Sequence, residues 1–182
     1  MSDSNPPTEP ESPFIANAGT KRRWRRRTIE AVVLLVVILG VRTWQQSGIV
    51  RGPAPVLAGV LLDGKPAALT EFAGRPVLVH FWASWCPICR AEQGSIDALA
   101  HDVPVITVAM QSGERAAVVQ HLRKEELSFP VLNDPDGAIA AQWGVRAVPA
   151  SFIVDGAGQI RYVEVGYTTG IGLRLRLWLA GL

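Results

Sequence analysis

The apolar positions of the chain fall into two patterns. Near the N-terminus one uncharged apolar run, 31–41, closely follows a dense basic run, 21–27. After residue 55 the apolar residues come in short stretches separated by glycine, proline and polar residues. The most continuous of these stretches begins at Val77 and does not alternate, which is typical of a strand buried on both faces. The pattern therefore predicts an N-terminal apolar segment followed by one globular domain with a central buried strand.

The globular part predicts strands that alternate with helices. Residues 56–69 read as a short hairpin with Asp63 and Gly64 as its turn signal. The elements expected after it are, in order, a strand from Val77, a helix from Cys86 to about Ala100, a strand at 103–110, a helix at 114–127, a strand at 129–132, a helix at 136–142, a hairpin of strands 151–155 and 159–165, and a helix at 170–182. This order indicates an α/β fold of three layers with a mixed central sheet.

The N-terminal pattern predicts a membrane anchor. Residues 1–20 are rich in proline, serine and acidic residues and are expected to form a disordered cytoplasmic tail. In 21–44 the basic run precedes an apolar core of eleven residues, and Trp24 and Trp44 lie twenty residues apart, a helix length of about 30 Å that matches the bilayer core. We expect one transmembrane helix that contacts lipid through residues 24–44; a cleaved signal peptide is the alternative, because its apolar region has a similar length.

The basic run also fixes the expected orientation. Positive residues stay on the cytoplasmic side, which would place the chain after Trp44 outside the cytoplasm, in the periplasm of a bacterium with its inner membrane as the anchor site. Residues 45–55 are expected to be a tether and 56–182 the periplasmic domain. From Gly52 onward there are ten basic and twelve acidic residues, so the sequence pI of about 8.8 reflects the N-terminal run and predicts no nucleic-acid partner.

The only two cysteines, Cys86 and Cys89, lie three residues apart where the buried strand leads into a predicted helix. Pro87 suits a first helical position because its missing N–H is not needed there. A helix N-terminus favours negative charge, so the thiolate of Cys86, the nucleophile of disulfide exchange, is favoured at this place. A structural bridge across so small a loop would constrain the unfolded chain little. The pair therefore predicts redox chemistry, and no cofactor or metal is expected.

The segment 81–89, Phe-Trp-Ala-Ser-Trp-Cys-Pro-Ile-Cys, closely resembles the active site of the thioredoxin fold. The resemblance covers residues 55–182. Val148-Pro149 precedes the strand from Ser151, where thioredoxin-like proteins keep a cis-proline opposite the cysteine pair, and proline in a central strand otherwise lacks an explanation. The resemblance implies a thioredoxin fold and thiol-disulfide oxidoreductase activity.

Three further features resemble the membrane-anchored TlpA-like branch of this family. The surplus length around 111–136 is similar to its central insertion, and Glu92 completes its Cys-x-x-Cys-x-x-Glu pattern. Residues 166–180 look most like suppressor for copper sensitivity protein D, while Cys-Pro-Ile-Cys-Arg-Ala-Glu at 86–92 is also similar to cytochrome c maturation thioredoxins.

The resemblance implies a role for each residue around the cysteines. Cys86 would attack a client disulfide and Cys89 would resolve the mixed disulfide, so that Cys86–Cys89 is the redox-active disulfide. Val148 and Pro149 would hold the client backbone beside Cys86. Trp85 would shape the docking surface, with simple packing as its alternative role.

One position departs from thioredoxin itself. His80 stands where thioredoxin carries a buried Asp, so Glu92 and His80 are the candidates for proton transfer at the buried cysteine. The alternatives are a solvated helix carboxylate for Glu92 and a hydrogen-bonded core histidine for His80. His101 and His121 are expected to be surface residues.

The expected function is reduction of specific client protein disulfides by a protein that a membrane electron transporter recharges. Copper tolerance or cytochrome c maturation is the setting that the resemblance implies. Three alternatives remain: a copper-binding carrier of the same fold, because two thiolates can hold a soft ion, a disulfide-donating oxidase, and a non-catalytic interaction module.

Overall fold

The computed structural model of the chain describes residues 18–46 and 50–182, without the side chains of 18–23, 39 and 41–46. The chain forms two units, Met1–Thr43 and Trp44–Leu182. The N-terminal helix α1, Ala18–Gln46, begins within the segment predicted as a tail, whose residues 1–17 lie outside the described part. The apolar side chains of Ile29 and of 32–38 are each at least 46% exposed. Within the part of the chain whose side chains are described, no helix is long and apolar enough to cross a membrane.

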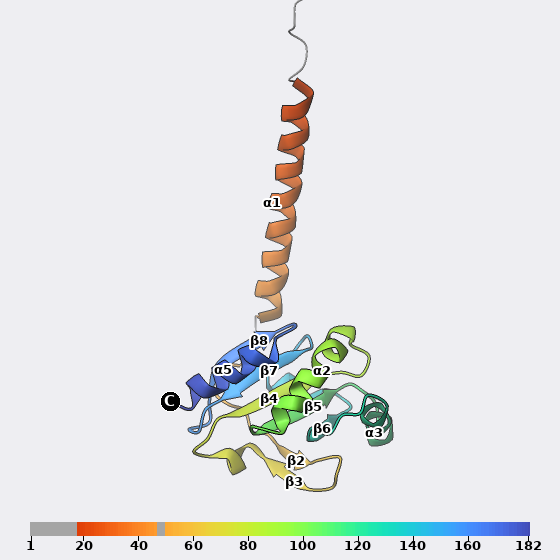
Figure 1. Cartoon of the computed structure of the whole chain (residues 1–182), viewed down its shortest axis with the longest axis vertical. Helices are drawn as coiled ribbons and strands as arrows, with labels where there is room; N and C mark the ends of the chain where they lie inside the picture. The colour runs from red at the N-terminus through yellow and green to blue at the C-terminus, as the bar shows by residue number, and fades with distance from the viewer. Residues whose placement is uncertain (1–17, 47–49) are drawn as a thin grey trace, which may run out of the picture. The chain divides into compact units, whose positions relative to one another are not determined.

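The second unit is organised around a six-stranded mixed sheet in the order β1–β8–β7–β4–β5–β6 (Figure 1). Its strands are β1 Gly52–Pro53, β4 Val77–Trp82, β5 Val105–Met110, β6 Val131–Asp134, β7 Ala150–Val154 and β8 Gln159–Val165. The central strand β4 runs parallel to β5 and antiparallel to β7. All six residues of β4 are buried, which confirms the prediction made from its continuous apolar run.

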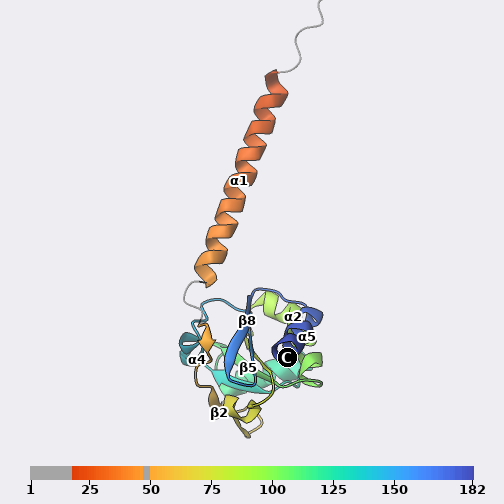
Figure 2. The same ribbon diagram turned by 90° about the vertical axis from the view of Figure 1, so that its left-hand side faces the viewer.

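Two layers cover the sheet, as Figures 1 and 2 show from two directions. The helices of this unit are α2 Pro87–Ala100, α3 Arg115–Lys124, α4 Ala138–Gln142 and α5 Gly170–Ala180. Leu78 and Trp82 of β4 pack in one apolar core with residues of α2, α3 and α5. Val79 and Phe81 pack in the other with Trp143, which follows α4. Because side chains alternate along a strand, His80 lies on the α2 side of the sheet with Leu78 and Trp82.

The predicted hairpin forms a separate two-stranded sheet of β2, Ala58–Val60, and β3, Pro66–Ala68, followed by the 3-10 turn η1, Leu69–Phe72. Arg115 of α3 holds this hairpin to the domain by donating hydrogen bonds to the carbonyls of Leu61 and Leu62. Leu57, Leu61 and Ala67 contribute to the core that contains Trp143. The hairpin thus closes one face of the domain.

The prediction that 45–55 is only a tether is wrong at its C-terminal end. Gly52 and Pro53 pair with Ile160 and Gln159 of β8 and form the edge strand β1. A two-residue segment that includes a proline gives no signal of a strand in the sequence. An edge strand nevertheless tolerates proline, because its outer side pairs with no other strand and needs no backbone N–H there. The folded domain therefore begins before residue 56.

Other boundaries move by a few residues for local reasons. The strand predicted at 103–110 begins at Val105, after Pro104, and the strand predicted at 129–132 lies at Val131–Asp134, after Pro130. α3 ends at Lys124, and Glu126 has a φ of +54°, a conformation that cannot continue a right-handed helix. The region 111–136, expected to be an insertion, supplies α3 and the edge strand β6.

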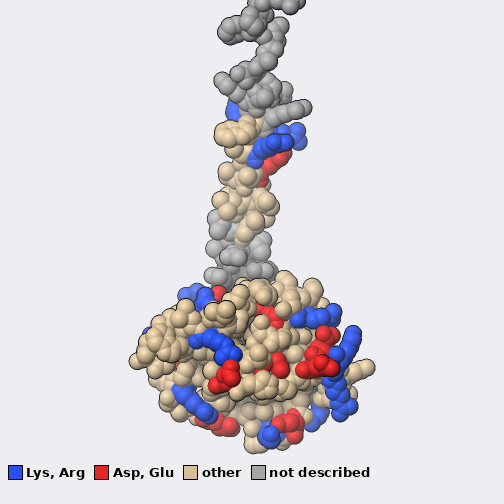
Figure 3. Space-filling model, in the orientation of Figure 1, with Lys and Arg blue, Asp and Glu red and all other residues tan. Residues whose placement is uncertain are grey.

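Charges of both signs are intermixed on the face of the domain seen in Figure 3. On α5, Arg174 pairs with Asp102 at 2.6 Å and Arg176 pairs with Glu164 of β8 at 2.8 Å. These pairs are partly exposed, so each is expected to contribute less than about 1 kcal/mol to stability.

Candidate active site

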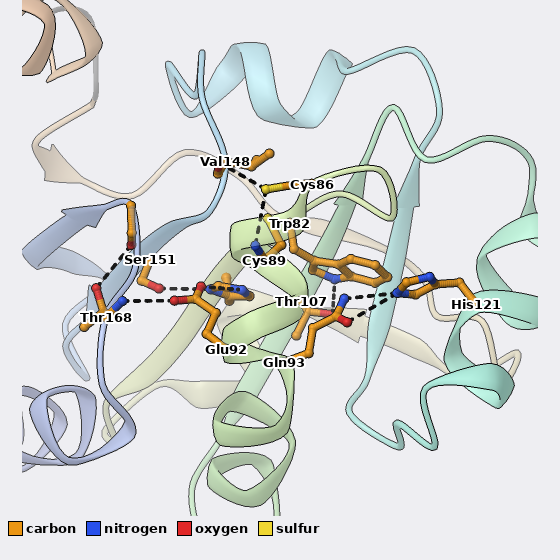
Figure 4. Close-up of polar contacts among 12 residues, drawn as sticks. Trp82, Cys86, Cys89, Glu92, Gln93, Thr107, His121, Val148, Ser151 and Thr168 are labelled. Atoms are coloured by element: carbon orange, nitrogen blue, oxygen red, sulfur yellow. Dashed lines mark hydrogen bonds and ion pairs between the residues drawn. The ribbon is translucent and has the colours of Figure 1, made fainter.

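Cys86 is the N-cap of α2, and Pro87 is the first helical residue, as predicted. The backbone of Cys86 is extended (φ −88°, ψ 115°), so its side chain turns back over the first turn of the helix. Its Sγ accepts a hydrogen bond from the backbone N–H of Cys89 at 3.2 Å (Figure 4). Cys86 is 5% exposed. The sulfur thus pairs with a backbone N–H of the first helical turn that has no partner within the helix.

Cys89 lies one turn along the same helix and is fully buried. Both cysteines are free thiols. Burial raises the pKa of the Cys89 thiol well above its usual range, and the neighbouring Cys86 and the charge of Glu92 act in the same direction. Cys89 therefore holds its proton firmly and needs a base if it is to attack.

The peptide bond between Val148 and Pro149 is cis, as expected from the position of this pair before β7. The thiol of Cys86 donates to the carbonyl oxygen of Val148 at 3.6 Å, as the upper part of Figure 4 shows. The loop before β7 thus lies against the sulfur. The loop after β8 is attached to the same place, because the backbone N–H of Gly166 donates to the carbonyl of Pro149 at 2.9 Å.

Trp85 stands beside the cysteines with 60% of its side chain exposed. Its indole N–H donates to the carbonyl of Gln111 at 3.0 Å, and the hydroxyl of Ser112 accepts the backbone N–H of Ser84 at 3.0 Å. These two bonds attach the loop before α2 to the loop after β5. Trp85 is therefore held in place while most of its ring surface stays free.

His80 and Glu92, proposed separately as proton-transfer candidates, are brought together in the buried space between β4 and α2. Each side chain is 1% exposed, and Nε2 of His80 lies 3.5 Å from Oε1 of Glu92. Burial raises the pKa of Glu92 to about 7, partly opposed by the hydrogen bond from Thr168, and burial lowers the pKa of His80 to about 3. Glu92 is thus not a solvated helix carboxylate. Its proton is exchangeable near neutral pH, while His80 stays uncharged.

Two further residues complete this buried group. The backbone N–H of Thr168 donates to Oε2 of Glu92 at 3.0 Å (Figure 4). Nδ1 of His80 lies 2.9 Å from Oγ of Ser151. Ser151 was visible in the sequence as one polar residue within an apolar strand. The role of Thr168 left no such signal, because it acts through its backbone from the loop before α5.

The prediction that His121 is a surface residue is wrong. Its ring lies against the ring of Trp82, with centroids 5.3 Å apart, and its Nε2 is within hydrogen-bond distance of the amide group of Gln93. Burial lowers the pKa of His121. On α3, His121 lies beside the apolar face of the helix. Its ring covers Trp82 and is therefore itself partly buried. His101, in contrast, is exposed, as expected.

Within residues 18–46 and 50–182, no group of three or more His, Cys, Asp or Glu side chains is placed to hold a metal ion. The chemistry that the described site supports is carried by its two sulfur atoms and by the proton of Glu92. A nucleophilic sulfur, a second buried sulfur within reach and an adjacent carboxyl are the parts that disulfide exchange requires.

Comparisons with known proteins point to the same chemistry. The Redoxin family matches residues 50–171. The "thiol:disulfide interchange protein DsbE homolog" of Paracoccus denitrificans is 36% identical over 122 residues, which cover 66% of this chain and 68% of that protein. The "thiol:disulfide interchange protein DsbE" of Xylella fastidiosa is 34% identical over 152 residues, 76% of each chain.

A solved structure shares the architecture. The putative thiol:disulfide interchange protein DsbE from Chlorobium tepidum is 25% identical, with a TM-score of 0.66, and the match covers 74% of this chain and 99% of that one. The thioredoxin fold expected from the cysteine motif is thereby confirmed. The Redoxin match at residues 50–171 includes the cysteine pair, and the relatives are thiol:disulfide interchange proteins. The chain therefore belongs to the Redoxin family and is a thioredoxin-like thiol:disulfide oxidoreductase.

Proposed function

We propose that this protein is a membrane-tethered reductant of specific protein disulfides in the bacterial periplasm, in the setting of copper tolerance or cytochrome c maturation. The observation that carries the proposal is the environment of Cys86. Its sulfur receives an N–H from the start of α2 and lies 3.6 Å from the carbonyl of the residue before the cis-proline. A client strand can approach this side, while Cys89 lies behind it.

The first step is attack on the client. The Cys86 thiolate attacks one sulfur of the client disulfide, a new S–S bond forms, and the second client sulfur leaves as a thiolate that takes a proton. The backbone beside Val148 and Pro149 offers the docking edge for the client strand, since Pro149 has no N–H to compete. Trp85 supplies exposed apolar surface next to this edge.

The second step releases the client. Cys89 gives its proton to the carboxylate of Glu92 and attacks Cys86, so that the Cys86–Cys89 disulfide forms and the client leaves with its second thiolate. Two electrons have then passed to the client, and the enzyme holds the disulfide. A membrane electron transporter would reduce it again by the reverse sequence.

The direction of electron flow in this proposal rests on the resemblance of the chain to the membrane-anchored TlpA-like branch. Strong oxidants of this fold have a reduced form that is specifically stabilised, so the reduction potential distinguishes the two directions.

The test of this proposal is equilibration of the full chain with glutathione redox buffers, followed by measurement of the oxidised fraction. We expect a reduction potential near that of thioredoxin, about −270 mV. A potential near about −120 mV, with rapid oxidation of reduced clients, would make the protein a disulfide donor instead. As the control, Cys86→Ser must abolish the reduction of insulin.

The tether and the location rest on the sequence pattern of α1. Arg25, Arg26 and Arg27 precede an apolar stretch, and positive residues of this kind stay on the cytoplasmic side. A tethered domain meets membrane partners at a raised effective concentration, which suits recharging by an electron transporter.

A further inference from the structure

The buried pair of His80 and Glu92 raises a question that disulfide exchange alone does not answer, namely where the proton of Glu92 lies. Nε2 of His80 is one of the buried polar atoms that lack a hydrogen-bond partner among the described residues. It lies 3.5 Å from Oε1 of Glu92. An unpaired buried acceptor of this kind is costly, so its partner must be identified.

The partners of the two carboxyl oxygens distinguish them. Oε2 accepts the backbone N–H of Thr168, so this oxygen is occupied as an acceptor. A proton on Glu92 therefore belongs on Oε1, which faces Nε2 of His80. An ion pair between the two residues would require a buried imidazolium, and burial disfavours that form strongly. A neutral acid facing a neutral imidazole satisfies both groups.

The far side of the ring is consistent with this arrangement. Nδ1 lies 2.9 Å from Oγ of Ser151, and a hydroxyl oxygen can accept an N–H. Ser151 is 3% exposed, so no solvent competes for its oxygen. The two strand residues face each other in register across β4 and β7, which fixes the ring between Ser151 and Glu92.

We propose that His80 is the positioning residue for the proton of Glu92: the neutral ring accepts the Oε1 proton at Nε2 and donates from Nδ1 to Ser151. The inference rests on the proposed function, in which Glu92 takes the proton of Cys89. An acceptor for the acid form makes Glu92 a stronger base, because hydrogen bonding to the neutral form favours that form. His80 thereby acts on the resolving cysteine through Glu92.

The other charged groups around the pair are few. Cys89 faces Glu92 from the same helix, one turn away. On β8, Glu164 lies opposite Ser151 and is paired with Arg176 of α5 at 2.8 Å. The loop before α5 contributes only the backbone N–H of Thr168. The pH dependence of the group is therefore assigned to Glu92, with Cys89 as its proton partner.

The test is the protonation state of the His80 ring, read from the nitrogen chemical shifts of the 15N-labelled full chain. The chain has three histidines, and His101→Gln and His121→Gln assign the signals by removing one each. At about pH 5.5 we expect His80 to be neutral with its proton on Nδ1. An imidazolium, or a neutral ring protonated on Nε2, would overturn the proposal.

Glu92→Gln is the matched variant, because its amide oxygen can accept from Thr168 while its NH2 donates to Nε2 as the acid does. We expect the neutral, Nδ1-protonated ring throughout the pH range above the lowered pKa of His80, about 3, in this variant. A ring protonated on Nε2 there would contradict the proposal.

A kinetic readout separates positioning from structure. In Ser151→Ala the Nδ1 proton loses its acceptor, which favours the ring form that donates to the Glu92 carboxylate. The pH at which the resolving step is half-maximal should fall by about one unit, whereas the exposed control Ser95→Ala should leave it unchanged. An unchanged midpoint in Ser151→Ala contradicts the proposal. Insulin reduction by the same samples tests the proposed function separately, since the ring state does not depend on turnover.

Discussion

At the scale of single residues, the burial of Glu92 has opposite effects on proton transfer and on stability. Its burial raises the pKa to about 7, which suits a group that exchanges a proton with a thiol near neutral pH. The same burial makes the ionised form costly. A carboxyl whose folded pKa lies above its unfolded value destabilises the fold as the pH rises between the two values.

This gives a prediction for Glu92→Gln. Between about pH 4.5 and 7 the wild type should lose about 3 kcal/mol of folding stability relative to the variant, and the difference should stay constant above that range. Denaturant unfolding of both proteins at several pH values measures it. His80 acts in the opposite direction, because its lowered pKa adds stability as the pH rises from about 3 to 6.5, but it is common to both proteins. A difference independent of pH would contradict the raised pKa of Glu92.

The individual roles of the reactive residues were more predictable than their contacts. Cys86, Cys89 and Pro149 belong to short motifs that resemble the thioredoxin active site, and this resemblance implies their roles. The meeting of His80 with Glu92 depends on the packing of a helix on a strand, and neither residue carries a local signal for the other. His121 was predicted wrongly because the sequence around it gives no sign of the Trp82 ring, which comes from β4 and lies beneath it.

At the scale of elements, α5 presents apolar residues on both of its sides. Leu173 and Leu177 are buried in the apolar core that α5 shares with the sheet and α2. Trp178 and Leu175 are 62% and 56% exposed. Helical periodicity separates these two sets, and only the buried set is expected to stabilise the fold.

Leu177→Ala should therefore reduce the free energy of unfolding by about 3 kcal/mol, because a buried leucine loses its transfer energy and leaves a cavity. Trp178→Ala is the matched control on the adjacent position and should change stability by less than about 0.5 kcal/mol. Urea unfolding compares the two. Equal losses would mean that the exposed side of α5 is covered in solution.

Element types were predictable where an apolar run was long, as in β4, and where a turn was marked, as at Asp63 and Gly64. Boundaries beside proline were less predictable, because strand pairing decides which residue joins the ladder. β1 could not be predicted at all, since Gly52 and Pro53 become a strand only through their partners on β8.

At the scale of the whole molecule, the chain combines an apolar N-terminal helix with a domain whose surface charges are mixed. Only a few residues separate Gln46, the end of α1, from Gly52, the start of β1. The five residues 47–51 allow at most about 20 Å between the two ends when the chain is extended. If α1 is held in a bilayer, the domain must work close to the membrane surface.

Carbonate washing of bacterial membranes tests this. The full chain should remain with the membrane fraction, whereas a variant that lacks residues 1–46 should be released into the soluble fraction. Protease added to spheroplasts should degrade the domain of the full chain while a cytoplasmic marker stays intact. A full chain released by carbonate, or protected from the protease, would contradict the proposed anchor and orientation.

The most direct measurement for the account concerns which sulfur bonds to the client. Purified Cys89→Ser is mixed with a small peptide disulfide, quenched with acid and mapped by mass spectrometry. In the proposed mechanism Cys86 attacks first and Cys89 only resolves, so the peptide should accumulate on Cys86 and be released by a thiol reductant. No adduct on Cys86, or an equal adduct on Cys89 in the Cys86→Ser protein, would contradict the assignment of Cys86 as the attacking sulfur.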